Sequence, residues 1–187
     1  MAIEYSKELE SHMIKNSEWG AVAYLSGSAY GRNGTKIDGI AEGDISGGGV
    51  GNFYITTGKM FSTTGNEYGI YDLNGSKSEY IAAYYNGKDA NEQFISRGKS
   101  FASIGGSSTK YATTYNSSGA SINSFKECYK YGDATYETLR IDYNNSFWLY
   151  NNNPFFYRPY GNEGLYSTMY NGGITYNNQS FRVILIV

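Results

Sequence analysis

The C-terminal part of the chain decides the fold. From Pro154 it reads Pro-Phe-Phe-Tyr-Arg-Pro-Tyr (154–160), and it ends in Ser-Phe-Arg-Val-Ile-Leu-Ile-Val (180–187). Aromatic and β-branched residues in a short run favour a strand, so residues 181–187 are predicted to form a core strand. The segment between the two stretches is rich in Tyr, Asn, Gly and Ser. Large, hydrogen-bonding side chains on a flexible backbone are typical of a binding surface rather than of a catalytic site.

Length and composition narrow the class of protein. A chain of 187 residues suits a single domain, 1–187. Charged residues make up only 17%, whereas there are 21 Tyr and 24 Gly, so neutral hydrogen-bonding groups carry most of the polarity. The net charge of -2 gives no basic surface to neutralise phosphates, and we therefore expect no nucleic-acid partner.

Cysteine content and the N-terminus bear on cofactors and location. Cys128 is the only cysteine, so neither an intrachain disulfide nor a cysteine metal cluster is expected. The first residues lack the basic region and apolar core of a signal peptide, and no run is long enough to span a membrane. We therefore expect no membrane insertion. Export would require a fused partner or release as part of a particle.

Regular structure is predicted to be sparse in the first half of the chain. Residues 5–16 contain good helix formers, with Leu9, Met13 and Ile14 on one face, and predict a helix. Residues 19–25 form a short apolar run between polar residues, which predicts a buried strand. Residues 26–52 are rich in Gly and predict a long excursion with little regular structure.

The second half combines turn signals with short apolar pieces. Residues 80–85 predict a second core strand, and residues 86–125 are mostly loop-like. The remaining elements that we expect are a short helix at 91–96, a strand or a helix at 136–141, and a strand at 146–150. No tandem repeat is visible. The pattern predicts an α+β domain in which a compact core presents large irregular surfaces.

Residue types that support catalysis are few. His12 is the only histidine and lies on the predicted N-terminal helix, so no base is available to activate a serine. Asp133 and Glu137 are suitable for acid/base chemistry, but their spacing fits a structural turn equally well. The glycines at 47–49 lack the Lys-Ser/Thr of a phosphate-binding loop. We therefore predict no catalytic residue and no cofactor.

Several segments together resemble one family. Residues 13–25, residues 62–80, residues 132–137 (Gly-Asp-Ala-Thr-Tyr-Glu) and residues 180–183 (Ser-Phe-Arg-Val) match, in order, segments of bacterial and phage proteins related to formylglycine-generating enzymes, or sulfatase-modifying factors. The resemblance begins with Lys-Asn-Ser-Glu-Trp-Gly-Ala-Val-Ala-Tyr-Leu and continues with Ser-Thr-Thr-Gly-Asn-Glu-Tyr-Gly-Ile-Tyr-Asp-Leu. It thus spans most of the chain.

The resemblance implies a C-type-lectin-like fold with a small twisted antiparallel sheet, one or two helices and long loops. The same fold displays variable residues in the target proteins of diversity-generating retroelements, including phage receptor-binding proteins, just before the closing strand. This chain departs from the family at Arg158-Pro159-Tyr160, at 74–80, and in beginning close to the first matching segment. The related oxidases use a pair of cysteines, which this chain lacks, so the resemblance does not extend to that activity.

Calcium-dependent sugar binding of the lectin type is also not predicted. The chain contains neither a Glu-Pro-Asn or Gln-Pro-Asp tripeptide nor a Trp-Asn-Asp strand. A structural calcium ion remains an alternative, because carbonyl, Asn and Asp oxygens are abundant in the loops. No residue pattern selects its ligands.

The candidate contact residues lie between the two apolar stretches. They are Tyr157, Tyr160, Asn162, Glu163, Thr168, Tyr170, Asn171, Tyr176, Asn177 and Asn178. Tyrosine gives large rigid contact area and asparagine gives adaptable hydrogen bonds, so we expect an adhesin-like, receptor-binding domain. Its partner would be a protein or glycan on a host or target cell, and its location a phage tail or a bacterial surface.

An alternative from another class uses the same residues. A particle or pilus subunit would bury this face in a homo-oligomer. In both interpretations the flanking residues are structural. We assign Phe155, Phe156, Leu165, Phe181 and Val183 to the core, and Arg158 and Arg182 to structural hydrogen bonds.

Overall fold

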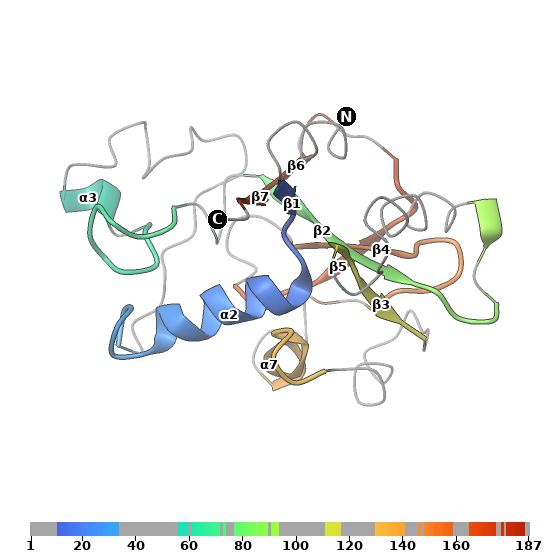
Figure 1. Ribbon diagram of the computed structural model, residues 1–187, viewed down its shortest axis with the longest axis horizontal. Helices are drawn as coiled ribbons and strands as arrows, with labels where there is room; N and C mark the ends of the chain where they lie inside the picture. The colour runs from blue at the N-terminus through green and yellow to red at the C-terminus, as the bar shows by residue number, and fades with distance from the viewer. Residues whose placement is uncertain are drawn as a thin grey trace.

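A computed structural model describes part of the chain. The described residues are 11–33, 56–59, 61–71, 73, 77–89, 91–93, 111–116, 130–140, 146, 148–158, 165–174, 177 and 179–185. They form the mixed α+β architecture that was predicted. Figure 1 shows the strands together and the helices α2 and α7 beside them.

The N-terminal elements differ from the prediction. Residues Ser11–Met13 form strand β1, and Asn16–Gly27 form helix α2. The predicted helix at 5–16 is therefore wrong over its described part, and the predicted strand at 19–25 is helical. Helix α2 begins where the Lys15 backbone N–H donates to the Glu18 carboxylate (2.8 Å). Its buried residues recur at helical spacing and are Asn16, Trp19, Gly20, Ala23 and Ser26.

The main sheet is built around β2. Strand β2 (Ser78–Tyr85) confirms the predicted core strand, and it pairs antiparallel with β4 (Phe155–Arg158). Strand β4 pairs antiparallel with β5 (Met169–Asn171). On its other edge, β2 pairs in parallel with β3 (Thr113–Tyr115) and β6 (Gln179–Phe181). The sheet is thus mixed, and the prediction of an antiparallel sheet is correct only for β2, β4 and β5.

Long connections explain the parallel pairs. Parallel strands require a crossover that returns the chain to the starting end of the sheet, whereas short hairpins give antiparallel pairs. More than twenty residues separate the end of β2 from the start of β3. Strand β3 lies in a stretch that was predicted to be loop, because its three residues form a strand only against β2.

The C-terminal strand is interrupted. Residues 181–187 were predicted as one strand, but β6 ends at Phe181 and β7 spans Val183–Leu185, with Arg182 between them. The Arg182 guanidinium donates to both carboxylate oxygens of Glu79, at 3.0 and 2.5 Å, and to the carbonyl of Tyr71 at 3.2 Å. Its predicted structural role is confirmed. Strand β7 pairs antiparallel with β1 in a separate two-stranded sheet.

The remaining elements are short. Helix α7 spans Thr135–Arg140 and resolves the ambiguity at 136–141, and α3 spans Thr56–Lys59. Glu92 and Gln93 are helical, within the short helix predicted at 91–96. The predicted strand at 146–150 is not confirmed, because among its described residues only Tyr150 makes a β-bridge. No helix in the described ranges is both long and apolar enough to cross a membrane.

The core lies between the sheet and α2. Alternate residues of β2 point to one face, where Ile81, Ala83 and Tyr85 pack in one buried cluster with Trp19 and Phe156. Trp148 and Tyr115 join this cluster, with ring centroids 4.9 Å apart. Phe155 and Phe181 pack, partly buried, against a second cluster on the opposite face, which contains Ala82 and Tyr84.

A buried polar group joins four segments at the centre of the core. The Arg158 guanidinium donates to Asn16 Oδ1 (2.8 Å), to the Asp133 carbonyl (2.9 Å) and to the carbonyls of Tyr166 and Ser167. Its ring neighbour is Trp19, 5.4 Å from the guanidinium carbon. All these acceptors are backbone or amide oxygens, so Arg158 holds the segments together by hydrogen bonds. This confirms its predicted structural role.

Candidate functional site

Half of the predicted contact residues can be located. Tyr157, Thr168, Tyr170, Asn171 and Asn177 are described. The other predicted contact residues lie outside the described residues and are Tyr160, Asn162, Glu163, Tyr176 and Asn178. The site is therefore built from the five located side chains and from the residues that they contact.

The register of β4 and β5 separates the two tyrosines. Phe156 pairs with Tyr170, and Tyr157 pairs with Met169. Directly paired residues share a face, and neighbours along a strand point to opposite faces. Phe156 is fully buried in the main core, so Tyr170 lies on the core face. Tyr157 lies on the opposite face, and the two side chains do not form one continuous contact surface.

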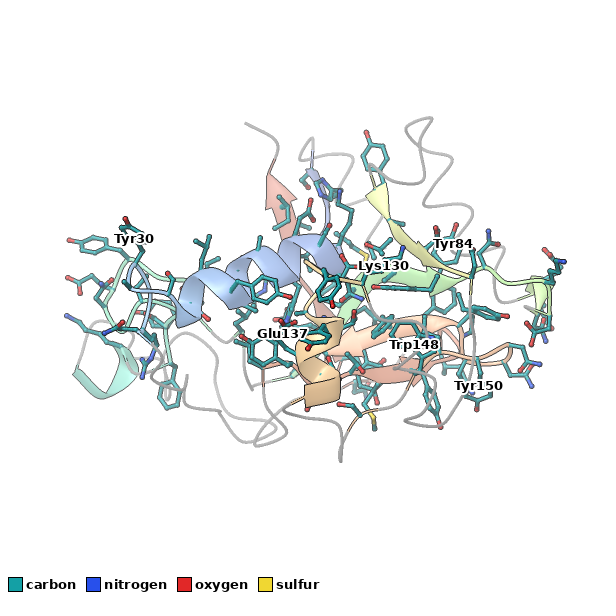
Figure 2. All side chains as sticks on the ribbon, turned by 90° about the horizontal axis from the view of Figure 1, so that it is seen from below. Tyr30, Tyr84, Lys130, Glu137, Trp148 and Tyr150 are labelled. Carbon is teal, nitrogen blue, oxygen red and sulfur yellow. The ribbon has the colours of Figure 1, made fainter. Side chains whose placement is uncertain are left out.

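Tyr170 packs, partly buried, against the main core and contacts Tyr150. The two rings make an edge contact with centroids 4.9 Å apart. Burial, and then the neighbouring Tyr150, raise the pKa of Tyr170, so its hydroxyl stays protonated. Tyr150 also accepts a hydrogen bond from the Asn153 amide, and Figure 2 places it in the half of the molecule away from Tyr30. The turn signal Asn-Asn-Asn-Pro at 151–154 could have revealed this corner.

Tyr157 belongs to a surface on the opposite face. Its ring contacts Tyr80 of β2 edge-on, with centroids 6.2 Å apart. The Tyr80 hydroxyl donates to the Ile174 carbonyl (2.8 Å), and the Lys77 ammonium donates to the Asn177 carbonyl (3.0 Å). These bonds fasten the segment that follows β5 to the beginning of β2. We call these five residues, Lys77, Tyr80, Tyr157, Ile174 and Asn177, the Tyr80 surface.

Three members of the Tyr80 surface are exposed: Lys77, which precedes β2, and two residues of the C-terminal segment. Ile174 is 56% exposed, and Asn177 is exposed as well. Lys77 and Tyr80 were not among the predicted contact residues, because they precede the C-terminal segment by about a hundred positions in sequence. Only the pairing of β2 with β4 and β6 brings them to this surface.

Two predicted contact residues lie beneath the surface. Thr168 is fully buried, and its backbone N–H donates to Ser146 Oγ (3.1 Å). Asn171 is also buried, and its Oδ1 accepts hydrogen bonds from the backbone N–H groups of Gly173 (2.7 Å) and Ile174 (2.9 Å). Asn171 therefore shapes the turn that presents Ile174, as asparagine side chains often do.

The groups suited to acid/base chemistry are engaged in structural contacts. His12 is buried on β1, and its Nε2 lies 2.7 Å from Glu18 Oε1. Asp133 accepts a hydrogen bond from the Tyr115 hydroxyl (2.8 Å), and Glu137 accepts one from Tyr24 (2.6 Å). Burial, followed by the Glu137 hydrogen bond, raises the pKa of Tyr24 to about 12.

The described residues also lack a metal-binding cluster. In the part of the chain that the structure describes, no three His, Cys, Asp or Glu side chains are placed to hold one ion. Cys128 lies outside the described residues. Comparison of the chain with protein-family models, with curated proteins and with solved structures gave no match. The function is therefore inferred from the residues themselves.

Proposed function

We propose that the chain is a non-enzymatic ligand- or receptor-binding domain that contacts a protein or glycan through the Tyr80 surface. The observation that carries this proposal is the attachment of an exposed segment to a rigid sheet. Ile174 and Asn177 are exposed, while the carbonyls of these same residues are held by Tyr80 and Lys77. A surface that is ordered before binding loses less conformational entropy when a partner arrives.

The chemistry of this surface suits recognition. Tyr80 and Tyr157 combine a large apolar ring with a hydroxyl group, and Asn177 adds an amide that can donate and accept hydrogen bonds. Tyrosine and asparagine are also enriched in the antigen-binding loops of antibodies. Lys77 is the single ionisable cation of the Tyr80 surface, so complementarity here depends mainly on shape and neutral hydrogen bonds.

We propose a C-type-lectin-like fold as the framework of this domain. The α+β architecture with helices α2 and α7 beside a small sheet is consistent with it. Segments that carry the resemblance also contact one another. Arg182 binds Glu79, and a Cβ atom placed on Gly20 would lie 2.0 Å from the Gly132 carbonyl oxygen. Direct contact between matching segments supports a shared framework.

We propose further that the domain is not catalytic, and two observations support this. The acid/base groups described above are occupied by structural hydrogen bonds, and Cys128 has no second cysteine with which to perform the thiol chemistry of the related oxidases. Display of the domain on a phage tail or a bacterial surface follows from the resemblance. A near-identical DNA repeat that differs at adenines, beside a reverse transcriptase gene, would support diversification of the exposed residues.

Binding is tested with the fluorescently labelled chain on a glycan array and on whole bacterial cells. Replacing Ile174 and Asn177 by Ala is expected to weaken the detected binding about tenfold or more, because central contact residues each contribute over about 1 kcal/mol. Tyr131→Ala is the matched control, since Tyr131 is 75% exposed but lies outside this surface. Equal binding by the double variant and the control would refute the proposal.

Light scattering after size exclusion separates the self-assembly alternative. If the double variant dissociates an oligomer while its ligand binding is unchanged, the Tyr80 surface serves assembly instead.

A further inference from the structure

We propose a second interaction site, independent of the Tyr80 surface, in which a pocket accepts one uncharged apolar side chain of a protein partner. The pocket has a volume of about 270 Å³ and lies between the C-terminal end of α2 and the loop at 61–71. Its described lining residues are Val22, Leu25, Ser26, Tyr30, Gly31, Thr63, Thr64, Tyr68, Gly69 and Ile70. This volume is close to the lower end of the range for ligand pockets.

The rim of the pocket exposes an unusual amount of apolar surface. Leu25 is 61% exposed, Tyr30 91%, Tyr68 86% and Ile70 40%. A single exposed apolar residue needs no explanation, but four around one hollow form the kind of patch that marks an interaction site. Figure 2 shows Tyr30 at the end of the molecule opposite Tyr150. A partner bound at Tyr30 would therefore leave the Tyr150 end accessible.

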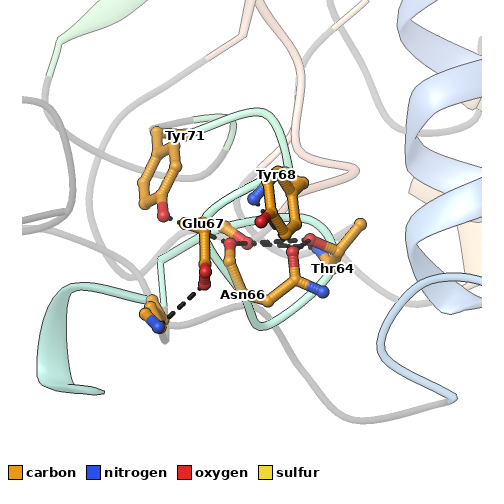
Figure 3. Close-up of polar contacts among 7 residues, drawn as sticks. Thr64, Asn66, Glu67, Tyr68 and Tyr71 are labelled. Atoms are coloured by element: carbon orange, nitrogen blue, oxygen red, sulfur yellow. Dashed lines mark hydrogen bonds and ion pairs between the residues drawn. The ribbon is translucent and has the colours of Figure 1, made fainter. Parts of the chain in front are cut away.

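The loop wall of the pocket is held by its own hydrogen bonds (Figure 3). The Thr63 N–H donates to the Ile70 carbonyl, and the Ile70 N–H donates to Thr63 Oγ1, both at 3.0 Å. Asn66 Oδ1 accepts from Thr64 Oγ1 (2.8 Å) and from the Tyr68 N–H (2.9 Å). The backbone that carries the Tyr68 ring is thus fixed, although the ring itself lies in solvent.

Further contacts brace the same loop from outside. Ser62 and Tyr71 form a β-bridge, and the Tyr71 hydroxyl donates to the Asn66 carbonyl (3.2 Å). The Lys59 ammonium lies 2.8 Å from a Glu67 carboxylate oxygen. A loop that is ordered in the free chain offers a preformed contact surface, which lowers the entropic cost of binding.

The wall formed by the end of α2 is equally defined. The Arg32 N–H donates to the Ser26 carbonyl (2.6 Å), and the Tyr30 N–H donates to Ser28 Oγ (3.2 Å). At Gly31 the chain passes so close to the helix that a Cβ atom would lie 2.4 Å from the Leu25 carbonyl oxygen. Glycine therefore permits the turn that places Tyr30 beside the pocket.

The polar groups inside the pocket favour an apolar occupant over a sugar. Ser26 Oγ donates to the Ala23 carbonyl (2.6 Å), while Thr63 Oγ1 and Thr64 Oγ1 are engaged within the loop. A saccharide requires many hydrogen bonds to replace its water, and the protons of the Ser26 and Thr64 hydroxyls are already donated within the chain. An apolar side chain requires no hydrogen bonds. It would contact Val22 and Leu25 from α2 and Ile70 from the loop at 61–71.

Charge and rim chemistry point to the same partner. No Asp, Glu, Lys or Arg lines the described part of the pocket, and Lys59 and Glu67 neutralise each other. A complementary partner surface is therefore uncharged at this point. The phenol groups of Tyr30 and Tyr68 lie at the exposed edge and can donate to a partner backbone. An apolar centre inside a rim of tyrosine hydroxyls is the usual anatomy of a protein interface.

The test uses the intact chain with isotope-labelled Ile, Leu and Val methyl groups. The probes are N-acetyl-leucinamide and N-acetyl-phenylalaninamide, and the comparison probes are N-acetyl-lysinamide and methyl β-glucoside. We expect saturable NMR shifts of Val22, Leu25 and Ile70 methyls with the two apolar probes, with dissociation constants on the order of millimolar. The Ile174 methyls, on the Tyr80 surface, should not move.

Variants sharpen the test. The exposed pair Leu25→Ser and Tyr68→Ser is expected to weaken binding of the apolar probes about tenfold or more, whereas Ile174→Ser is the matched control and should leave it unchanged. Larger shifts with the glucoside or the lysinamide would overturn the proposal. Shifts at these methyls on changing protein concentration alone would identify a second copy as the occupant, and absence of any shift would also overturn it.

Discussion

Replacing Tyr115 by Phe removes one oxygen atom from the centre of the core. The Tyr115 hydroxyl donates to Asp133 Oδ2 (2.8 Å) and accepts from Asn16 Nδ2 (3.1 Å). The phenyl ring that remains can keep its contacts with Trp148 and Phe156, whose centroids lie 4.9 and 5.4 Å away. The substitution therefore reports on the polar contacts with little change in packing.

The cost follows from the two lost hydrogen bonds. A hydrogen bond to a charged group contributes about 1.5–3 kcal/mol, and the Asn16 amide loses an acceptor worth about 1 kcal/mol. Together we expect the free energy of unfolding to fall by about 2.5–4 kcal/mol at neutral pH, a large share of the roughly 5–15 kcal/mol that stabilises a typical domain.

We expect the loss of stability caused by Tyr115→Phe to increase with pH. Burial raises the pKa of Asp133 above 3.8, while the Tyr115 hydrogen bond opposes this rise. A carboxyl group with a raised folded-state pKa binds its proton more tightly when folded, so stability falls as pH rises from 3.8 through the folded-state pKa. Tyr115→Phe raises that pKa further, and its destabilisation should therefore grow with pH before levelling off.

Urea unfolding followed by tryptophan fluorescence measures this effect. The midpoints of wild type and variant are compared below pH 3.8 and at neutral pH. Tyr131→Phe, at a 75% exposed position, serves as the control and should change stability by less than about 0.5 kcal/mol. A loss at neutral pH as small as that of the control, or a loss that shrinks as pH rises, would refute the reasoning.

Two further predictions concern the backbone. Gly20→Ala should destabilise by ~1–3 kcal/mol or more, because its Cβ would lie 2.0 Å from the Gly132 carbonyl oxygen. Gly27→Ala, in the same helix with nothing within 4 Å of its Cβ, should stabilise by about 0.4–1 kcal/mol, and thermal unfolding of both variants checks the contrast. Asn171→Ala should lower the free energy of unfolding by about 1–2 kcal/mol, because alanine has no side-chain oxygen to accept from the N–H groups of Gly173 and Ile174. Asn171→Asp keeps such an oxygen and should lower it less. Equal urea midpoints for the two variants would contradict this.

The error at α2 shows why local patterns are insufficient. A short apolar run such as 19–25 fits a buried strand or a buried helix equally well. Helix α2 places Asn16 in the core, although asparagine is a residue type that is mostly exposed. Asn16 is buried because Arg158 and Tyr115 supply its hydrogen bonds, and Tyr115 lies 99 positions away.

The candidate site likewise depends on contacts that a local sequence pattern does not predict. Composition predicts a contact surface among the C-terminal tyrosines and asparagines, but which of these side chains share a face of the sheet can be read only after the strand register is known. The pairing of Phe156 with Tyr170 turns Tyr170 toward the core and Tyr157 away from it. Lys77 and Tyr80 lie on the Tyr80 surface because β2 pairs with β4 and β6, and no short sequence motif predicts these pairings.

Sequence alone determined the α+β class, the core strand at 80–85 and the neutral, tyrosine-rich character of the C-terminal segment, because these depend on composition and on neighbouring residues. Tertiary structure decided which residues of that segment are exposed, why Arg182 divides the closing strand, and where exposed apolar side chains surround a pocket. These features depend on contacts between residues far apart in the chain. Such contacts are set by packing and hydrogen bonding of the whole fold rather than by local preference.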